Sequence, residues 1–242
     1  PQRDERLGWT GDAQVFFRTA SFLGRVDNFF NKWLADLKVE QRPDGRVPRV
    51  IPDTYCAGDY RTAATGWADA STIVPWNHYM AYGHIQILEQ QYDSMKGWVD
   101  YMVSQSKDRG WLWNNGSHYG DWLFYSLAND PGGRSAVTSS HLVAQCFFAH
   151  SADIVCRTAK LLGKQEDADY YADIASKVRK AYMDEYVTPN GLISSDTQTA
   201  YVLALQFNML PECRQIRTGR GWHLQRAAGQ SGCGLHGSLP RF

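Results

Sequence analysis

Several features that would assign a protein class are missing from this sequence. Its 25 basic and 25 acidic residues cancel, so no net charge favours nucleic acid or an anionic membrane surface as a partner. No stretch reaches the roughly 18 apolar residues of a membrane span, and no charged segment followed by an apolar one marks a secretion signal. We therefore expect neither nucleic acid nor a membrane as a partner. Because the chain begins at Pro1 rather than Met, we expect its native N-terminus upstream, and no compartment is predicted.

Paired cysteines are also missing. The five cysteines are an odd number, are widely spaced and include no CxxC pair, which argues against a disulfide framework and a zinc site. His141 and His150 are nine residues apart, whereas two metal ligands on one helical face are usually four apart. Glycine-rich phosphate loops and GxSxG motifs do not occur either. We expect reduced, mostly buried thiols and neither a metal nor another cofactor.

Aromatic residues, by contrast, are abundant. They make up 13% of the chain, and nine of them are tryptophans. Trp and Tyr combine a flat apolar face with a polar edge, which suits the binding of sugars. A helical core filled with aromatic rings would use the same residues, so composition alone leaves both roles open.

The spacing of apolar residues predicts helices. From Val15 to Leu37 they recur every three or four positions, which predicts one long amphipathic helix with Asp12 as its N-cap. Three prolines and a glycine within residues 42–53 end this pattern. No convincing alternating strand appears, so we expect an all-α fold. Further helices are predicted at 71–82, 85–106, 139–162, 166–187 and 197–209, with a loop rich in Gly, Trp and Asn at 108–135.

The last thirty residues, 213–242, follow no such pattern. They contain no Asp, Glu or Lys, but five Arg, six Gly and two Cys. A disordered basic tail is one explanation. We favour the other, a reading frame that slipped near Leu210 or Pro211, because the change is abrupt and ends an ongoing helical array.

The first segment, PQRDERLGWTGDAQ at 1–14, is the most specific candidate site. Its two glycines are poor helix formers and predict a loop. In such a loop Glu5 beside Trp9 would be partly desolvated, which would raise the pKa of the carboxyl group and suit a general acid. The alternative is an exposed turn in which Arg3 and Arg6 form salt bridges.

A second candidate segment is GWADASTIVPW at 66–76. Asp69 fits the N-cap of the following helix, which is a purely structural role. Trp67 and Trp76 flank it, and either of them could belong to the core.

The third candidate segment, HYGDWLFY at 118–125, lies in the glycine-rich loop. Here Trp122 stands next to Asp121 rather than on an apolar helix face. An indole that stacks on a sugar ring beside a carboxylate that accepts its hydroxyls is suited to a sugar site. Together the three segments favour glycoside chemistry.

These segments resemble a known family. PQRDERLGWTGDAQ closely resembles the signature of the bacterial α-L-rhamnosidases of glycoside hydrolase family 78, and GWADASTIVPW, YGDW and TQTAYVLAL at 197–205 resemble further segments in the same order. The likeness covers nearly all of residues 1–212. It implies an (α/α)6 barrel of six inner and six outer helices, whose loops at one rim hold the sugar. Residues 1–212 would then be a partial catalytic domain, about half a barrel, followed by an atypical tail at 213–242.

The resemblance also implies roles for residues. Glu5 corresponds to the general acid, which protonates the glycosidic oxygen as rhamnose departs. Aromatic side chains would frame the sugar and contact its C6 methyl group, and no cofactor is involved. The substrates would be rhamnose-containing glycosides or polysaccharides. The expected sugar-binding residues are Arg3, Trp9, Asp12, Trp67, Asp121 and Trp122.

Two carboxylates of the family pattern are absent from this chain. One is an aspartate just upstream of the first motif, and the other is the general base, a glutamate late in the barrel. The family inverts configuration, so this base must activate water on the opposite face of the sugar. The carboxyl groups of base and acid are then roughly 6.5 to 9.5 Å apart. Asp59, Asp69 and Asp121 are possible substitutes. We expect the chain as written to be a truncated and inactive fragment.

Three alternatives stay open at this stage. The chain could belong to another (α/α)6 glycosidase with a different sugar, or to a carbohydrate-binding helical protein that has lost catalysis. A structural helical scaffold is the weakest option, because it leaves the acids and tryptophans in the loops unexplained.

Overall fold

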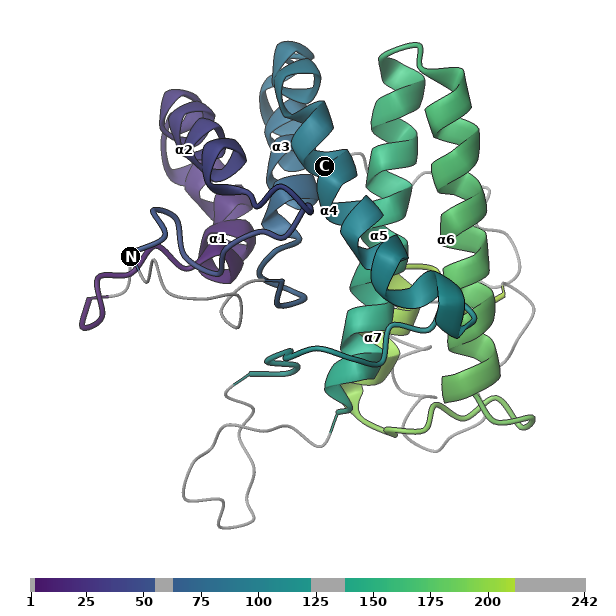
Figure 1. Ribbon diagram of the computed structural model, residues 1–242. Helices are drawn as coiled ribbons and strands as arrows, with labels where there is room; N and C mark the ends of the chain where they lie inside the picture. Colours follow the sequence, from purple (N-terminus) through teal and green to yellow (C-terminus); the bar gives the residue numbers. More distant parts are fainter. Residues whose placement is uncertain (1–2, 55–62, 123–137, 212–242) are drawn as a thin grey trace.

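The computed structural model describes residues 3–54, 63–122 and 138–211, and the fold in these ranges is helical (Figure 1). Within them the only β structure consists of two isolated bridges, so the all-α prediction is confirmed. None of the described helices is long and apolar enough to cross a membrane. The helices are α1 Thr10–Leu23, α2 Asp27–Glu40, α3 Ala70–Tyr82, α4 Gln86–Ser106, α5 Ser140–Leu161, α6 Gln165–Tyr186 and α7 Gln198–Gln206.

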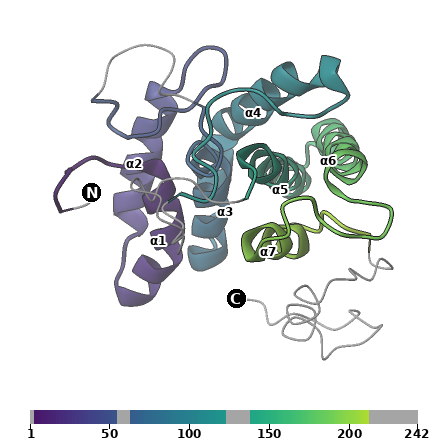
Figure 2. The same cartoon turned by 90° about the horizontal axis from the view of Figure 1, so that it is seen from below.

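The helices form two layers along an arc (Figure 2). The odd-numbered helices follow one another in one layer, in which α1 packs on α3, α3 on α5 and α5 on α7. The even-numbered helices cover this layer: α2 packs on α3 and α4, α4 on α3 and α5, and α6 on α5. An inner layer of alternate helices backed by an outer one is the arrangement of a partial (α/α)6 barrel.

Burial differs clearly between the neighbouring helices α5 and α6. The inner α5 buries 14 of its 22 residues, whereas the outer α6 buries 8 of 22. The exposed face of α6 carries charged pairs four residues apart, Asp173 with Lys177 and Lys180 with Asp184. An outer helix needs one apolar stripe only, and an inner helix is covered on most sides.

Aromatic side chains fill the core between the layers. The ring centroids of Trp98 and Trp113 lie 5.8 Å apart, and those of Trp113 and Phe148 lie 6.4 Å apart. Trp33 is buried as well, so the core role of tryptophan holds for these three indoles. Cys146 and Cys156 are free and buried, as predicted, whereas the other cysteines lie outside the described residues.

The single long helix predicted up to Leu37 is wrong, because the chain reverses between α1 and α2. Gly24 is extended at φ −171° and ψ 174°, and its N–H closes α1 on the carbonyl of Ala20 at 3.0 Å. The apolar spacing continues through the break because α1 and α2 both contribute buried residues to the same core. The other predicted helices agree with α3 to α7 within three residues at each end.

The predicted N-cap at Asp12 is also wrong. α1 begins at Thr10, with Trp9 in the N-cap position, so Asp12 lies in the first turn and is exposed. The helix starts earlier because Thr10 is fixed from outside: its N–H donates to the carbonyl of Arg49 at 2.9 Å. A carboxylate in the first turn is still favourable, since it faces the positive end of the helix dipole.

The first motif is paired with the proline-rich segment. Ile51 donates its N–H to the carbonyl of Gly8 at 2.8 Å, and Trp9 and Val50 form an antiparallel bridge. The two backbones approach so closely that a Cβ at Gly8 would lie 2.1 Å from the carbonyl oxygen of Ile51. Only glycine fits this contact.

We therefore predict that Gly8→Ala lowers the free energy of unfolding by about 2 kcal/mol or more, because a backbone carbonyl has to move. Gly24→Ala is the matched control, since no atom lies within 4 Å of its added Cβ. Urea unfolding of both variants checks this. Equal midpoints for the two variants would contradict the close approach at Gly8.

Candidate active site

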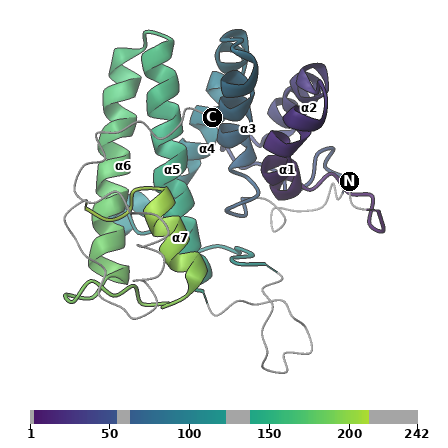
Figure 3. The ribbon, with the colours of Figure 1, turned by 180° about the vertical axis from the view of Figure 1, so that it is seen from behind.

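The segments with the sequence motifs meet at one end of the inner helices. Residues 3–9 precede α1, residues 63–69 precede α3 and residues 110–122 precede α5 in sequence. They all lie on the lower side in Figures 1 and 3, whereas the short turns that close the helical hairpins lie on the upper side. The inner helices run in the same direction, so the loops before them share one rim.

Tyr119 is the centre of an aromatic cluster at this rim. Its ring centroid lies 4.6 Å from that of Trp67, 5.0 Å from that of Trp122 and 6.3 Å from that of Trp9. Trp67 and Trp9 are half-buried, and 42% of Trp122 is exposed. The structure thus brings together three tryptophans that the sequence places in three separate segments, and each of them keeps part of its surface exposed.

Glu5 is connected to this cluster through Trp9. The indole Nε1–H of Trp9 donates to Oε2 of Glu5 at 2.5 Å. The predicted desolvation of Glu5 is wrong, because residues 3–5 form a surface turn in which the side chain is exposed. A hydrogen bond from an indole orients the carboxyl group at the edge of the aromatic cluster without burying it.

The other predicted polar residues differ in how they are placed. Asp121 accepts a hydrogen bond from Oγ1 of Thr199 at 2.6 Å, which ties the YGDW segment to α7. Arg3 and Asp12 are exposed, and their side chains form no hydrogen bond or ion pair within the described residues. Arg3 and Arg6 form no salt bridge within these ranges, so the alternative of a salt-bridged turn is not supported there.

Asp69 holds the N-cap position of α3, as the sequence predicted, but its side chain makes no capping hydrogen bond and is fully buried. Its Oδ1 accepts from Nε1 of Trp98 at 2.9 Å and from Oγ of Ser151 at 2.7 Å, and its Oδ2 accepts from the N–H of Gly66 at 2.8 Å. Burial raises the pKa of this carboxyl group, against the opposing effect of the three donors. With 0% exposure it cannot activate water, so it is no substitute for the general base. Asp59 lies outside the described residues.

His118 connects two of the loops. Its Nδ1 accepts from the N–H of Thr65 at 3.2 Å, so its Nε2–H donates to the carbonyl of Asn115 at 2.9 Å. Burial lowers the pKa of His118 to about 4, because the positive charge would lose its hydration. The neutral ring therefore holds the segment before α3 against the segment before α5.

Sequence reasoning missed several residues of this site. Tyr119 is part of the quoted YGDW segment, and its position three residues before Trp122 was an available signal. Arg49, whose Cζ lies 4.5 Å from the ring centroid of Tyr119, follows no recognisable pattern. The sequence indicates Gly11 only as a poor helix former, yet it lies in α1, and a Cβ there would lie 2.9 Å from the Trp67 ring, so α1 needs a glycine to pack on it.

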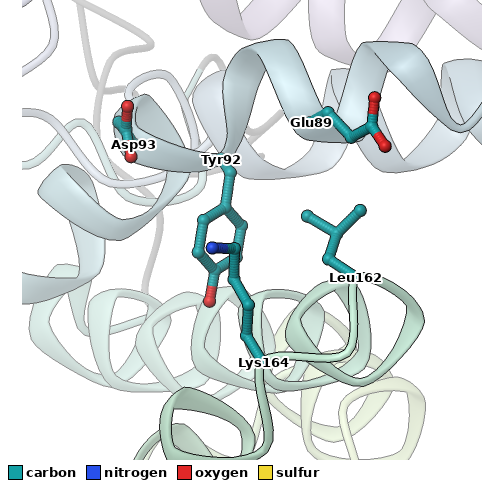
Figure 4. Close-up of a pocket in the computed structure, with 5 residues that line it drawn as sticks. All are labelled: Glu89, Tyr92, Asp93, Leu162 and Lys164. Atoms are coloured by element: carbon teal, nitrogen blue, oxygen red, sulfur yellow. The ribbon is translucent and has the colours of Figure 1, made fainter.

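A separate hollow of about 380 Å³ lies near the opposite end of the helices. Figure 4 shows Tyr92 and Glu89 of α4 across from Leu162 and Lys164, which belong to the turn between α5 and α6. The hydroxyl of Tyr92 donates to Asp167 at 2.8 Å, and Lys96 pairs with the same carboxylate. The hollow contains none of the predicted site residues.

Across the ranges that the structure describes, no three His, Cys, Asp or Glu side chains gather in a way that could hold a metal ion.

The two-layered helical arc, with aromatic side chains and a carboxylic acid at one rim, defines the class as a glycosidase domain built from helical hairpins. Residues 1–233 match the bacterial alpha-L-rhamnosidase 6 hairpin glycosidase domain. The chain belongs to this family.

Individual relatives agree with this assignment. An alpha-L-rhamnosidase of Streptomyces avermitilis is 37% identical over 233 residues, which are 93% of this chain and 21% of the relative. The crystal structure of the Streptomyces avermitilis alpha-L-rhamnosidase complexed with L-rhamnose matches with a TM-score of 0.77 and 38% identity, over 94% of this chain and 21% of that one. The native enzyme of Aspergillus terreus matches with a TM-score of 0.82 and 34% identity, over 94% of this chain and 26% of that one. This chain therefore spans about a fifth of the length of the curated relatives it matches.

We predict that Asp69→Asn lowers the free energy of unfolding by about 3 kcal/mol, because the new NH2 group would face donors instead of accepting from them. Asp93→Asn is the matched control on α4, since 87% of the Asp93 side chain is exposed. Thermal unfolding of both variants checks this. If Asp69→Asn melts with the control, the buried hydrogen bonds of Asp69 do not support the fold.

A pH dependence follows from His118. The unfolded chain binds a proton at this residue near pH 6.5 and the folded chain only near pH 4, so the folded state takes up protons less readily. The free energy of unfolding should be unaffected above pH 6.5 and fall as the pH drops from 6.5 towards 4, by up to about 1.4 kcal/mol per pH unit for this group. Burial lowers the pKa of His150 to about 4 as well, which adds to the same trend.

The contribution of His118 is measured by comparing the wild type with His118→Gln in urea at several pH values. Gln keeps one donor and one acceptor but does not titrate, so its curve should be flatter between pH 6.5 and 4. Parallel curves would show that His118 gains a proton as easily in the folded chain as in the unfolded one.

Proposed function

We propose that this chain contains the acid-bearing and sugar-binding part of an enzyme that hydrolyses terminal α-L-rhamnose from glycosides or polysaccharides with inversion of configuration. The observation that carries the proposal is the connection from Glu5 through Trp9 to Tyr119 and its two further tryptophans. The names of the relatives support it, as does the L-rhamnose bound to the Streptomyces enzyme.

The geometry is suited to this chemistry. Rhamnose is a 6-deoxy sugar, so an apolar wall of indole rings favours its C6 methyl group over a hydroxymethyl group. Glu5, at the edge of the wall, would donate its proton to the glycosidic oxygen as the bond breaks. The Nε1–H of Trp9 then stabilises the carboxylate that remains, since a hydrogen bond to a charged acceptor is stronger than one to a neutral acceptor.

The general base is the missing part of this mechanism. Asp69 is buried in the core, and Asp121 is engaged by Thr199. We propose that the base comes from the part of the family domain that this chain does not span. The chain by itself should then bind rhamnose but turn over very slowly.

In the enzyme at its native length, Glu5→Gln should lower kcat by about two to four orders of magnitude, because Gln cannot donate the proton. KM should change little, since Gln keeps the shape and the hydrogen bond to Trp9. Release of aryl alcohol from an aryl α-L-rhamnoside measures both constants. The matched control is Glu89→Gln, at the hollow on the opposite rim.

Other outcomes separate the alternatives. Equal rates for Glu5→Gln and the control would remove Glu5 as the acid. Turnover of a different aryl glycoside with no action on the rhamnoside would favour another glycosidase of this fold. Affinity for rhamnose without turnover at native length would favour a binding protein that has lost catalysis.

A further inference from the structure

Arg49 is a buried cation with no acidic partner among the described residues. Only 6% of the residue is exposed, and within the described ranges no carboxylate pairs with it. Its Nη1 donates to the hydroxyl of Tyr119 at 3.0 Å, and its Nη2 donates to the carbonyl of Ser117 at 2.8 Å. Its buried Nε–H has no hydrogen-bond partner in the part of the chain that the structure describes.

Such a group is costly for the fold. Removing a guanidinium group from water is unfavourable unless charge pairing and hydrogen bonds compensate for the lost hydration. Here the compensation comes from two hydrogen bonds and from the face of Tyr119, whose ring centroid lies 4.5 Å from Cζ of Arg49. A lysine could supply the charge but not the planar fork that reaches both acceptors. The position is therefore suited to holding Tyr119 rather than to stabilising the core.

The backbone of the same residue holds the acid-bearing segment. The carbonyl of Arg49 accepts from the N–H of Thr10 at 2.9 Å and from Oγ1 of Thr10 at 3.1 Å. Thr10 directly follows Trp9, the residue that orients Glu5. One residue of the proline-rich segment thus ties the start of α1 through its carbonyl and the centre of the aromatic cluster through its side chain.

We propose that Arg49 is a positioning residue for the sugar site, which fixes Tyr119 and through it the indoles of Trp9, Trp67 and Trp122. The effect of Arg49 on ligand affinity depends on the function proposed above, whereas the effect of Arg49 on the positions of the tryptophans does not. If Tyr119 moved, the ring contacts that set the three indoles would move with it. The spacing of a wall that stacks on a sugar ring would then be lost.

The first test reads the tryptophans directly. The full chain is labelled with 15N on its indole groups, and the Nε1–H signals of the wild type, Arg49→Lys and Tyr119→Phe are compared by NMR. We expect both variants to shift the signals of Trp9, Trp67 and Trp122 and to leave those of the core residues Trp33 and Trp98 in place. Arg157→Lys is the matched control, because Arg157 stacks on Trp76 of α3 at 4.6 Å and contacts none of the cluster.

The second test titrates the same samples with L-rhamnose and with L-mannose, which differs by a hydroxyl at C6. The wild type should prefer L-rhamnose. Arg49→Lys should bind L-rhamnose about ten-fold more weakly than the control, as expected for the loss of a hydrogen bond from a charged group. Combining Arg49→Lys with Tyr119→Phe should weaken binding less than the product of the two single effects, because they remove the same contact.

The outcomes distinguish the two proposals. Unchanged signals for Trp9, Trp67 and Trp122 in Arg49→Lys, with a melting temperature like that of the wild type, would overturn the positioning role. The same holds if Arg157→Lys shifts these signals equally. If the signals shift in Arg49→Lys and Tyr119→Phe but the wild-type chain binds neither sugar, the positioning role is supported and the result counts against the proposed function.

Discussion

The buried carboxylate of Asp69 is the interaction on which the arrangement of this part of the barrel depends. It stands at the start of α3 and accepts hydrogen bonds from Trp98 of α4, Ser151 of α5 and the backbone of Gly66. A fully buried carboxylate is tolerated only when donors surround it, so the three contacts require one another. They fix the angle between successive hairpins and the loop that carries Trp67.

The site follows from the direction of the inner helices. Because α1, α3, α5 and α7 begin at the same rim, the segments before them converge there, and so do the positive ends of their helix dipoles. The positive potential at this rim stabilises a carboxylate there and favours hydrogen bonds to sugar hydroxyls. The turns at the other end are short and carry no residue of the candidate site. The loops at one rim therefore carry the candidate site, and the turns at the other end only close the hairpins.

Within the site, rigidity comes from groups that do not touch a ligand. His118 fixes two loops as a neutral ring, and Thr199 holds Asp121. Arg49 links the acid-bearing turn to Tyr119. The proposed contact groups, Glu5 and Trp122, are by comparison exposed. The groups that hold the loops are thus more buried than Glu5 and Trp122.

Much of this protein is determined by local sequence. Apolar spacing located five of the helices, and the order of the motifs identified the fold, because periodicity and short motifs are properties of neighbouring residues. Three features depended on residues distant in sequence: the start of α1 at Thr10, the burial of Asp69 and the grouping around Tyr119. Thr10 is held by Arg49, 39 residues away, and Asp69 by Ser151, 82 residues away. Only the packing of the hairpins brings such partners together, so the tertiary structure alone decided which acids are exposed and which support the core.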